Sequence, residues 1–475
     1  MHSIVPRLSG RTGSARAAVA PIDRRSQRGL DWLNFFVANL QTAFGPFIAV
    51  YLTGQHWTQG QIGLVLTVGS VTAMASQVPA GLVVDLLRNK HQVAAAAILA
   101  IVLSCLLLAV LPDRLPVTAA EVLHGFASCM LNPAIAAITL SLVAAQTMAG
   151  SHTPQNRSRD AAEAAAAAQA ALGERFGRNN SFGQIGSALA AGLMGGVGYL
   201  VSARATFFLG AALALPGLVA LHAIARVPEP DAAGTSGPVP HAHEPVTVTK
   251  PPHGLRTLLH DRRLFGFGVC VVFFHLSAAG MLPLAAGEVT REAGHLAEPV
   301  IAACILMPQI IGAILSPRIG HWAGIHGRRP IMLVAFAALP LRGVLLAVSG
   351  APWMIVVVQL LDAVSSAAFG VMLPLVAADL SRGTGRFNLC MGLLGLAMGV
   401  GASFSTTLSG FVADRSLPAG FLLLAAAGLA CVLSVWLLFP ETAPPRPASP
   451  DEDDQDPLSS ASAEPEALSR AGTPG

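Results

Sequence analysis

Long apolar segments alternate with short polar turns along most of the chain. Each segment is near the length of roughly 20 residues that an α-helix needs to cross a bilayer. Glycine, proline or charged residues separate one segment from the next. The pattern therefore predicts an all-α membrane protein with twelve transmembrane helices. These are expected at residues 30–52, 61–84, 92–111, 117–146, 181–203, 205–225, 265–287, 299–317, 331–350, 354–378, 388–411 and 418–439.

Polar segments divide the chain into two halves. Residues 1–29 form a basic tail, residues 227–263 a linker rich in proline and histidine, and residues 443–475 an acidic, proline-rich tail that is expected to be disordered. A six-helix half is expected over residues 30–226 and another over residues 264–442. The first tail lacks the apolar core of a signal peptide, and we interpret it as cytoplasmic, although its arginine- and serine-rich composition also fits an organellar transit peptide.

Composition narrows the class of protein further. Of the 475 residues, 53% are hydrophobic and 12% are charged, about half the charged fraction of a typical soluble protein. The formal net charge of +3 is too small to indicate a nucleic-acid partner. The six cysteines lie in apolar segments, without the spacing of a disulfide framework or a metal site.

Motifs for chemistry on a cofactor are missing from the sequence. It contains no P-loop glycine–lysine motif for ATP and no pattern of nucleophile, base and orienting group. We therefore expect neither an enzyme nor an ATP-driven pump, and no cofactor or metal.

The basic residues indicate an orientation. If both termini face the cytoplasm, most of the 29 lysines and arginines fall in cytoplasmic segments. This distribution agrees with the positive-inside rule. We therefore expect a multi-pass protein of the inner or plasma membrane, with both ends inside.

The two halves resemble each other in sequence. Pro46 matches Pro283, the segment EVLHGFAS from Glu121 matches QLLDAVSS from Gln359, and FGRNN ending at Asn180 matches TGRFN ending at Asn388. The spacing is coherent if residues 150–176 are an insertion, whose alanine-rich part, 160–173, should form a surface helix. Repeated halves are typical of transporters that rock around a central site.

A short charged turn occurs once in each half. It reads QVPAGLVVDLLRNK at residues 77–90 and LSPRIGHWAGIHGRRP at residues 315–330. The pair resembles the loop between helices 2 and 3 of major facilitator superfamily transporters, and its repetition between the halves makes the match specific. The first copy departs from the family pattern at Arg88 and Asn89, and the second has Gly324 in place of the aspartate.

The resemblance implies that these turns form a cytoplasmic gate. In the family, the aspartate of the turn faces the start of helix 11 when the transporter is open to the outside, so Asp85 is expected near Arg386 and Asn388. Gly324 cannot make the matching contact with Arg178, which predicts an asymmetric gate. The expected gate residues are Gly81, Asp85, Lys90, Gly320, Gly327, Arg328, Arg329 and Arg386.

Polar residues inside apolar segments are the candidates for a substrate or proton pathway, because such residues are costly in a membrane. The resemblance implies that helices 1, 4, 7 and 10 line the cavity, which favours Gln41 and His275. Glu121 and His124 lie one turn apart and could exchange protons, or Glu121 could simply reach water at the interface.

Three further candidates lie close together in the second half. Arg342 and Asp362 are expected at similar depth in neighbouring helices, with Gln359 one turn from Asp362. They form either a fixed ion pair between helices or a proton site at Asp362.

The resemblance implies secondary active transport of a small solute by alternating access, with protons as the driving ion and export somewhat favoured. Two alternatives stay open. One is proton-linked uptake of an organic anion held by Arg342, and the other is a non-transporting sensor or scaffold. The expected partners are the solute, protons and the lipid bilayer, and the protein is expected to be a monomer.

Overall fold

The computed structural model describes residues 24–226 and 261–442, except for residues 43, 45, 58, 88, 151–158, 293–296, 349–350, 383 and 385. All regular secondary structure in these residues is helical. The acidic tail, most of the basic tail and of the linker, and residues 151–158 of the insertion lie outside the described ranges.

The helices of the first half are α1 (Arg24–Thr42), α2 (Pro46–Gly54), α3 (Gln59–Leu86), α4 (Lys90–Val110), α5 (Arg114–Gly150), α6 (Arg159–Leu200) and α7 (Ala203–Ala223). Those of the second half are α9 (Arg262–Glu292), α10 (Ala297–His326), α11 (Arg328–Phe336), α12 (Ala338–Val348), α13 (Pro352–Leu380), α14 (Phe387–Ala413) and α15 (Leu417–Leu438).

The predicted all-α membrane fold is confirmed. Ten helical segments of the described chain are long and apolar enough to cross a membrane. The two other predicted spans are the first, which is interrupted between α1 and α2, and the fifth, which is the glycine-rich part of α6. Every predicted span thus corresponds to one helix or to two consecutive helices.

Local sequence explains several helix boundaries. The side chain of Asn89 accepts a hydrogen bond from the first turn of α4, and Ser202 does the same for α7. Pro352 begins α13, where a missing N–H costs nothing. The ninth span is divided at Ala337, next to the Phe336 carbonyl that Pro340 cannot hydrogen-bond.

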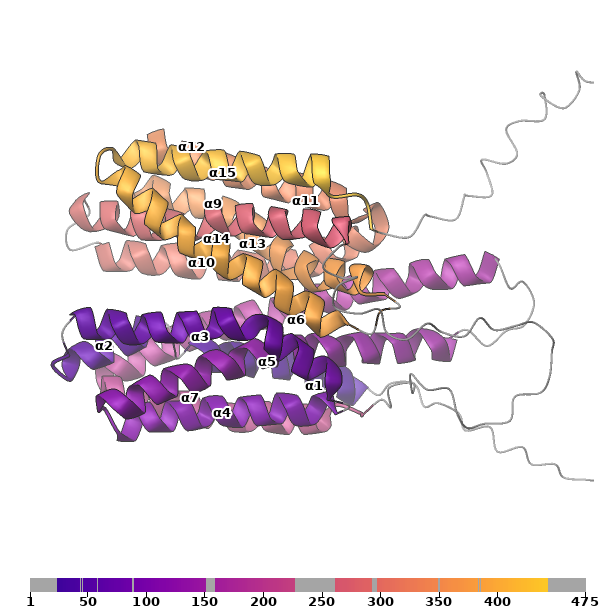
Figure 1. Cartoon of the computed structure of the whole chain (residues 1–475), viewed down its shortest axis with the longest axis horizontal. Coiled ribbons are helices and arrows are strands. Elements are labelled where there is room, and N and C mark those ends of the chain that lie inside the picture. The colour runs from indigo at the N-terminus through magenta and orange to yellow at the C-terminus, as the bar shows by residue number, and fades with distance from the viewer. Residues whose placement is uncertain are drawn as a thin grey trace, which may run out of the picture.

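The two halves form two layers that lie side by side (Figure 1). One buried apolar cluster lies wholly within the first half, whereas a second is centred in the second half and also includes Ala136, Val143, Leu172 and Phe176 of the first half. Between the halves, α6 packs along α10 and α3 packs along α14. We call the end of the bundle where α3 ends and α4 and α11 begin the basic end, because Lys90, Arg328 and Arg329 lie there, and the opposite end the far end.

Helix α6 is longer than expected. The helix expected at residues 160–173 is present, but it is not a surface helix of its own, because α6 is continuous over its 42 residues. At 1.5 Å per residue it is about 63 Å long, roughly twice the thickness of the hydrocarbon core. Its first turns project beyond the other helices at the basic end (Figure 1). No proline interrupts the segment, so the alanine-rich run simply extends the transmembrane helix.

Candidate functional site

Asp85 joins the halves at the basic end. Its carboxylate accepts hydrogen bonds from the backbone N–H groups of Asn388 (3.0 Å) and Leu389 (2.8 Å) and from the Asn388 side chain (2.7 Å). These N–H groups belong to the first turn of α14, where backbone N–H groups have no acceptor within their own helix. Gly81 allows the approach, since a Cβ there would lie 2.2 Å from the Asn388 carbonyl oxygen. Asp85 thus caps a helix of the other half.

The contact between α6 and α10 is built differently. A Cβ at Gly320 would lie 2.1 Å from the Gly173 carbonyl oxygen, and one at Gly324 would lie 2.7 Å from the Cα of Ala170. The backbones therefore touch, and no aspartate fits at position 324. Moreover, α6 is in mid-helix here, so its N–H groups are already bonded. Arg178, which the family pattern would place opposite this turn, instead contacts Asp31.

Arg328 is fully buried at the start of α11 and joins three elements. It forms an ion pair with Asp379 at 3.0 Å, donates to the Ala323 carbonyl at 2.8 Å and contacts the Gln169 side chain of α6. Gly327 precedes it with φ +92°, a conformation that favours glycine. Glu441 accepts the backbone N–H groups of Arg328 and Arg329 and so caps α11.

The two remaining basic gate candidates have local roles. The Lys90 ammonium donates to the carbonyls of Val84 and Leu87, at 2.8 Å each, and so satisfies the end of α3. Arg386 immediately precedes α14, and its Nε is buried without a described partner. Asp85 is bound by Asn388 and Leu389 rather than by Arg386.

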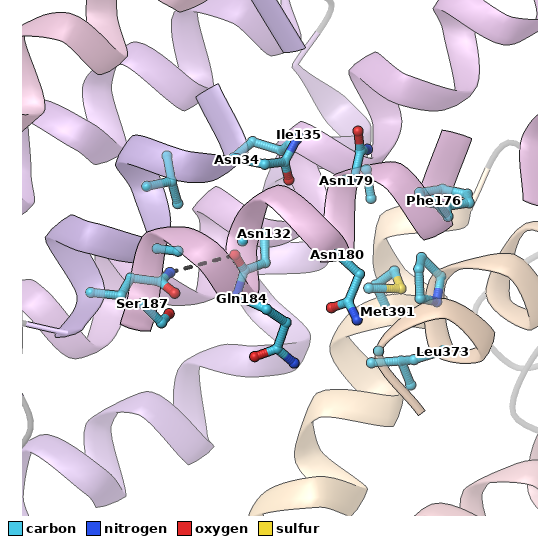
Figure 2. Close-up of a pocket in the computed structure, with 17 residues that line it drawn as sticks. Asn34, Asn132, Ile135, Phe176, Asn179, Asn180, Gln184, Ser187, Leu373 and Met391 are labelled. Atoms are coloured by element: carbon cyan, nitrogen blue, oxygen red, sulfur yellow. Dashed lines mark hydrogen bonds between the residues drawn. The ribbon is translucent and has the colours of Figure 1, made fainter. Parts of the chain in front are cut away.

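A cavity of about 350 Å³ lies between the halves (Figure 2). Six side-chain amides line it, and we call it the amide cavity. One side of it carries apolar side chains, among them Phe176, Leu373 and Met391. Gln41 lies here and contacts Asn132 at a long 3.4 Å. The six amides are those of Asn34, Gln41, Asn132, Asn179, Asn180 and Gln184.

A second cavity of about 710 Å³ adjoins the amide cavity and shares Asn132, Leu373 and Met391 with it. It extends toward the far end between α3 and α14, as far as Leu66 and Ser403. His275 lines it, with its Nδ1 3.2 Å from the Val271 carbonyl and its ring against Phe369. The two halves are therefore in contact at the basic end, and the two cavities lie between them from there toward the far end.

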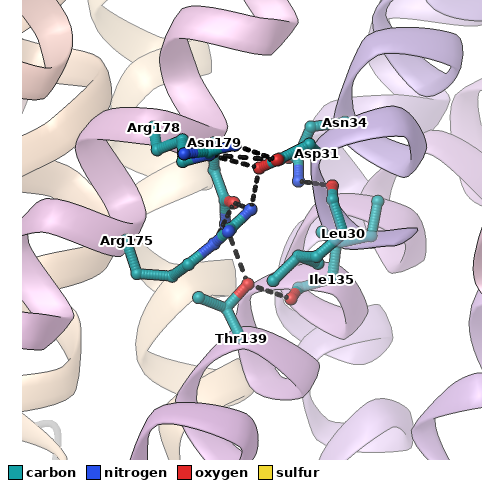
Figure 3. Close-up of polar contacts among 8 residues, drawn as sticks. All are labelled: Leu30, Asp31, Asn34, Ile135, Thr139, Arg175, Arg178 and Asn179. Carbon is teal, nitrogen blue, oxygen red and sulfur yellow. Dashed lines mark hydrogen bonds and ion pairs between the residues drawn. The ribbon is translucent and has the colours of Figure 1, made fainter. Parts of the chain in front are cut away.

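Asp31 is the centre of an ionic network (Figure 3) that adjoins the amide cavity through Asn179. Arg175 donates to Asp31 at 2.5 Å and Arg178 at 2.6 Å, and the Asp31 side chain is only 3% exposed. Arg175 also holds Asn179, which donates to Thr139 at 2.9 Å. Burial lowers the pKa of Arg175, while the hydrogen bond to Asp31 raises the pKa of Arg178. Both guanidiniums stay charged, because arginine does not deprotonate in proteins.

Glu121 and His124 lie inside the first half and line neither cavity. Glu121 is 5% exposed and lies against Gly69 of α3, and its Oε1 has no described partner. The ring of His124 stacks on Phe44 at 3.7 Å. No hydrogen bond links Glu121 to His124 within the described part of the chain.

Arg342, Gln359 and Asp362 lie together within the second half. Arg342 donates to Asp362 at 2.5 Å and to Gln359 at 2.7 Å, and its side chain is 2% exposed. Asp362 is 26% exposed. It lies eleven residues before the cavity residue Leu373 on α13. Eleven residues make about three helical turns, so the two residues are on nearly the same face of α13. Neither Arg342 nor Asp362 lines a cavity described above.

Sequence reasoning missed most of the amide cavity and the whole Asp31 network. Asn179 and Asn180 were visible within the repeated FGRNN segment, and Asp31 as an acidic residue in a basic stretch. Their spatial relation could not be deduced, because it depends on which faces of α1, α5 and α6 meet. Among the described residues, no group of three His, Cys, Asp or Glu could hold a metal ion.

Comparison with known proteins gives relatives over most of the chain. A sequence model of the Major Facilitator Superfamily matches residues 30–307 and 268–471. An uncharacterized MFS-type transporter of Mycobacterium tuberculosis (strain H37Rv) is 32% identical over 426 residues, which cover 89% of this chain and 95% of the relative.

Two more distant similarities add less. The class B tetracycline resistance protein of Escherichia coli is 29% identical over 133 residues, 28% of this chain and 33% of that protein. The proton:xylose symporter XylE superposes with a TM-score of 0.65 over 89% of this chain and 97% of its own, at 10% identity. The likeness to XylE shows the fold alone.

Proposed function

The chain belongs to the major facilitator superfamily of transporters, and on that premise we propose that it exports a small solute by alternating access, driven by protons. The observation that carries this proposal is the cavity between the halves. It is closed at the basic end by the Asp85 contacts and by the touching backbones of α6 and α10, and it extends toward the far end. This arrangement fits one state of a rocking cycle.

We infer that the basic end faces the cytoplasm of the cell's inner or plasma membrane. Lys90, Arg328 and Arg329 lie there, and positive residues are retained on the cytoplasmic side. The described conformation is then open to the outside. In this orientation a solute from the cytoplasm enters after the basic end opens.

Two carboxyl groups are candidates for the coupling proton. Asp362 is partly exposed and paired with Arg342, so a proton that binds it would release the arginine. Glu121 is buried and has an oxygen without a described partner, and an ionised carboxylate is costly in such a place. We favour Asp362, because it is partly exposed and lies on nearly the same face of α13 as the cavity residue Leu373, although it lines neither cavity itself, whereas Glu121 is buried between α5 and α3.

Export is supported by the partial similarity to a tetracycline resistance protein, since a transporter confers resistance by removing a drug. The organic-anion alternative has less support, because Arg342 is held by Asp362 and Gln359 and lines neither cavity. A sensor would not require a cavity of this kind between two halves.

The test is proton flux in proteoliposomes that contain the purified full-length protein and a pH-sensitive dye. A panel of sugars, drugs and organic acids is added on either side of the membrane. We expect a solute that stabilises the protein against heat to drive proton movement. Asp362→Asn should still be stabilised by the solute but should lose most of the proton flux. Glu121→Gln and the exposed control Asp113→Asn should retain the proton flux.

Solute binding without proton movement in the unmodified protein would overturn the coupling. Full flux in Asp362→Asn would exclude Asp362 as the proton site. Its ion pair with Arg342 would then be a structural link between α12 and α13.

A further inference from the structure

We propose that the solute is uncharged and polyhydroxylated, with the chemistry of a sugar or sugar alcohol. This inference rests on the proposed transport function and concerns the amide cavity. It depends on three features of that cavity: its charge, its hydrogen-bonding groups and its apolar wall.

The first feature is that no ionisable side chain lines the amide cavity among the described residues, while the second cavity has His275 and Cys129. Among the described residues that line either cavity, none is Asp, Glu, Lys or Arg. The nearby charges are engaged elsewhere, since Asp31 is buried between Arg175 and Arg178 and Arg342 is bound to Asp362. A charged solute would lose its hydration here without meeting an opposite charge, which is costly.

The second feature is unused hydrogen-bonding capacity. The side chains of Gln184 and Ser187 have no described hydrogen bond, and the amide of Asn34 uses only its N–H group. Gln41 has only its long contact to Asn132. Amides and hydroxyls both donate and accept. Sugar hydroxyls do the same, so several of them can be satisfied together by this set.

The third feature is the apolar wall of the same cavity. Phe176, Leu373 and Met391 lie on one side of it, across from Asn34, Asn132 and Gln184 (Figure 2). A sugar has C–H faces and hydroxyl edges, so its faces can lie against this wall while its edges meet the amides. The volume of about 350 Å³ is in the range of sites for small molecules.

The experiment compares rings of one shape and three charges. The probes are glucose, glucuronate and glucosamine, together with xylose and mannitol as further neutral members. Binding to the purified full-length protein is measured by thermal unfolding in detergent at millimolar concentration. We expect one or more neutral members to raise the unfolding temperature by several degrees, and their charged counterparts to have little effect.

Two glutamine variants locate the binding. Gln184→Leu should weaken binding of the neutral solute roughly tenfold, because it removes hydrogen bonds without changing the fold. Gln92→Leu, an exposed glutamine at the start of α4, should bind as the unmodified protein does. Equal affinities in the two variants would overturn the assignment to the amide cavity.

Failure of this inference can be distinguished from failure of the transport function. Binding of glucuronate or glucosamine without any neutral member, or no neutral binding at all, overturns the inference. If the charged solute moves protons in proteoliposomes, the transport function stands. A neutral solute that binds at Gln184 but moves no protons supports the inference and overturns only the proton coupling.

Discussion

At the residue scale, Asp31 shows how one buried carboxylate can organise a site without lining it. It forms ion pairs with both Arg175 and Arg178 of α6, and Arg175 in turn orients Asn179, whose amide lines the amide cavity. The network thus connects the N-terminal part of α1 to Asn179, which lines the amide cavity. We infer that Asp31 positions α6 and does not contact the solute.

The first prediction concerns Asp31→Asn. This variant leaves the charge of the largely buried Arg175 unpaired, so the free energy of unfolding should fall by about 3 kcal/mol. Thermal and denaturant unfolding in detergent would measure the change. Asp113→Asn, an exposed aspartate in the α4–α5 turn, should stay within about 0.5 kcal/mol of the unmodified protein. An equal stability of the two variants would show that the network is not structural.

Sequence reasoning at this scale was uneven. The neighbourhood of Asp85 could be anticipated, because the family motif states what the aspartate faces. The proximity of Arg342 and Asp362 followed from their depth in consecutive spans. The Asp31 network could not be anticipated, since residues 31 and 175 are joined only by the packing of α1 on α6.

At the element scale, the unequal lengths of α6 and α14 explain why the two repeated turns, at residues 77–90 and 315–330, differ. Helix α14 begins at Phe387 and offers free N–H groups to Asp85. Helix α6 begins twenty residues before Asn179, the repeat equivalent of Phe387, and passes α10 in mid-helix. An aspartate at position 324 would find no free N–H groups, so glycine replaces it and allows the backbones to touch.

The second prediction tests this contact with Gly320→Ala. The added methyl group would overlap the Gly173 carbonyl, so closure of the basic end should become unfavourable. The reporter is a cysteine at Ser187 in the amide cavity, labelled by an impermeant maleimide from either side of the membrane. Labelling from the basic side should increase severalfold and labelling from the far side should decrease.

Gly192→Ala is the matched control, because a Cβ at this glycine of α6 has open space around it. If Gly320→Ala and Gly192→Ala gave the same labelling ratio, the touching backbones would not control closure.

The length of α6 could not be predicted from the sequence, because helix propensity cannot distinguish a separate surface helix from a continuation of the next span.

At the scale of the whole molecule, composition and the internal repeat were sufficient for the fold. Apolar segments of bilayer length and repeated motifs left few alternatives to two six-helix halves. The cavity was not predictable to the same degree, because it arises where the halves face each other. Only Gln41 and His275 among the pathway candidates line a described cavity.

The central claim is that the halves rock, so that opening the basic end closes the far end. Spin-label distances test it most directly, with one cysteine pair at Leu87 and Leu437 for the basic end and another at Leu111 and Val348 for the far end. All four side chains are exposed. The native cysteines are buried, so that labelling should be selective.

The two distances are measured in the protein with Asp85 unchanged and in the Asp85→Asn variant. Loss of the charge at the start of α14 should weaken closure by about 1–2 kcal/mol, roughly a tenfold shift between the two states. We predict that the distance at the basic end lengthens while the distance at the far end shortens. Distances that both stay unchanged, or that both change in the same direction, would contradict alternating access in this protein.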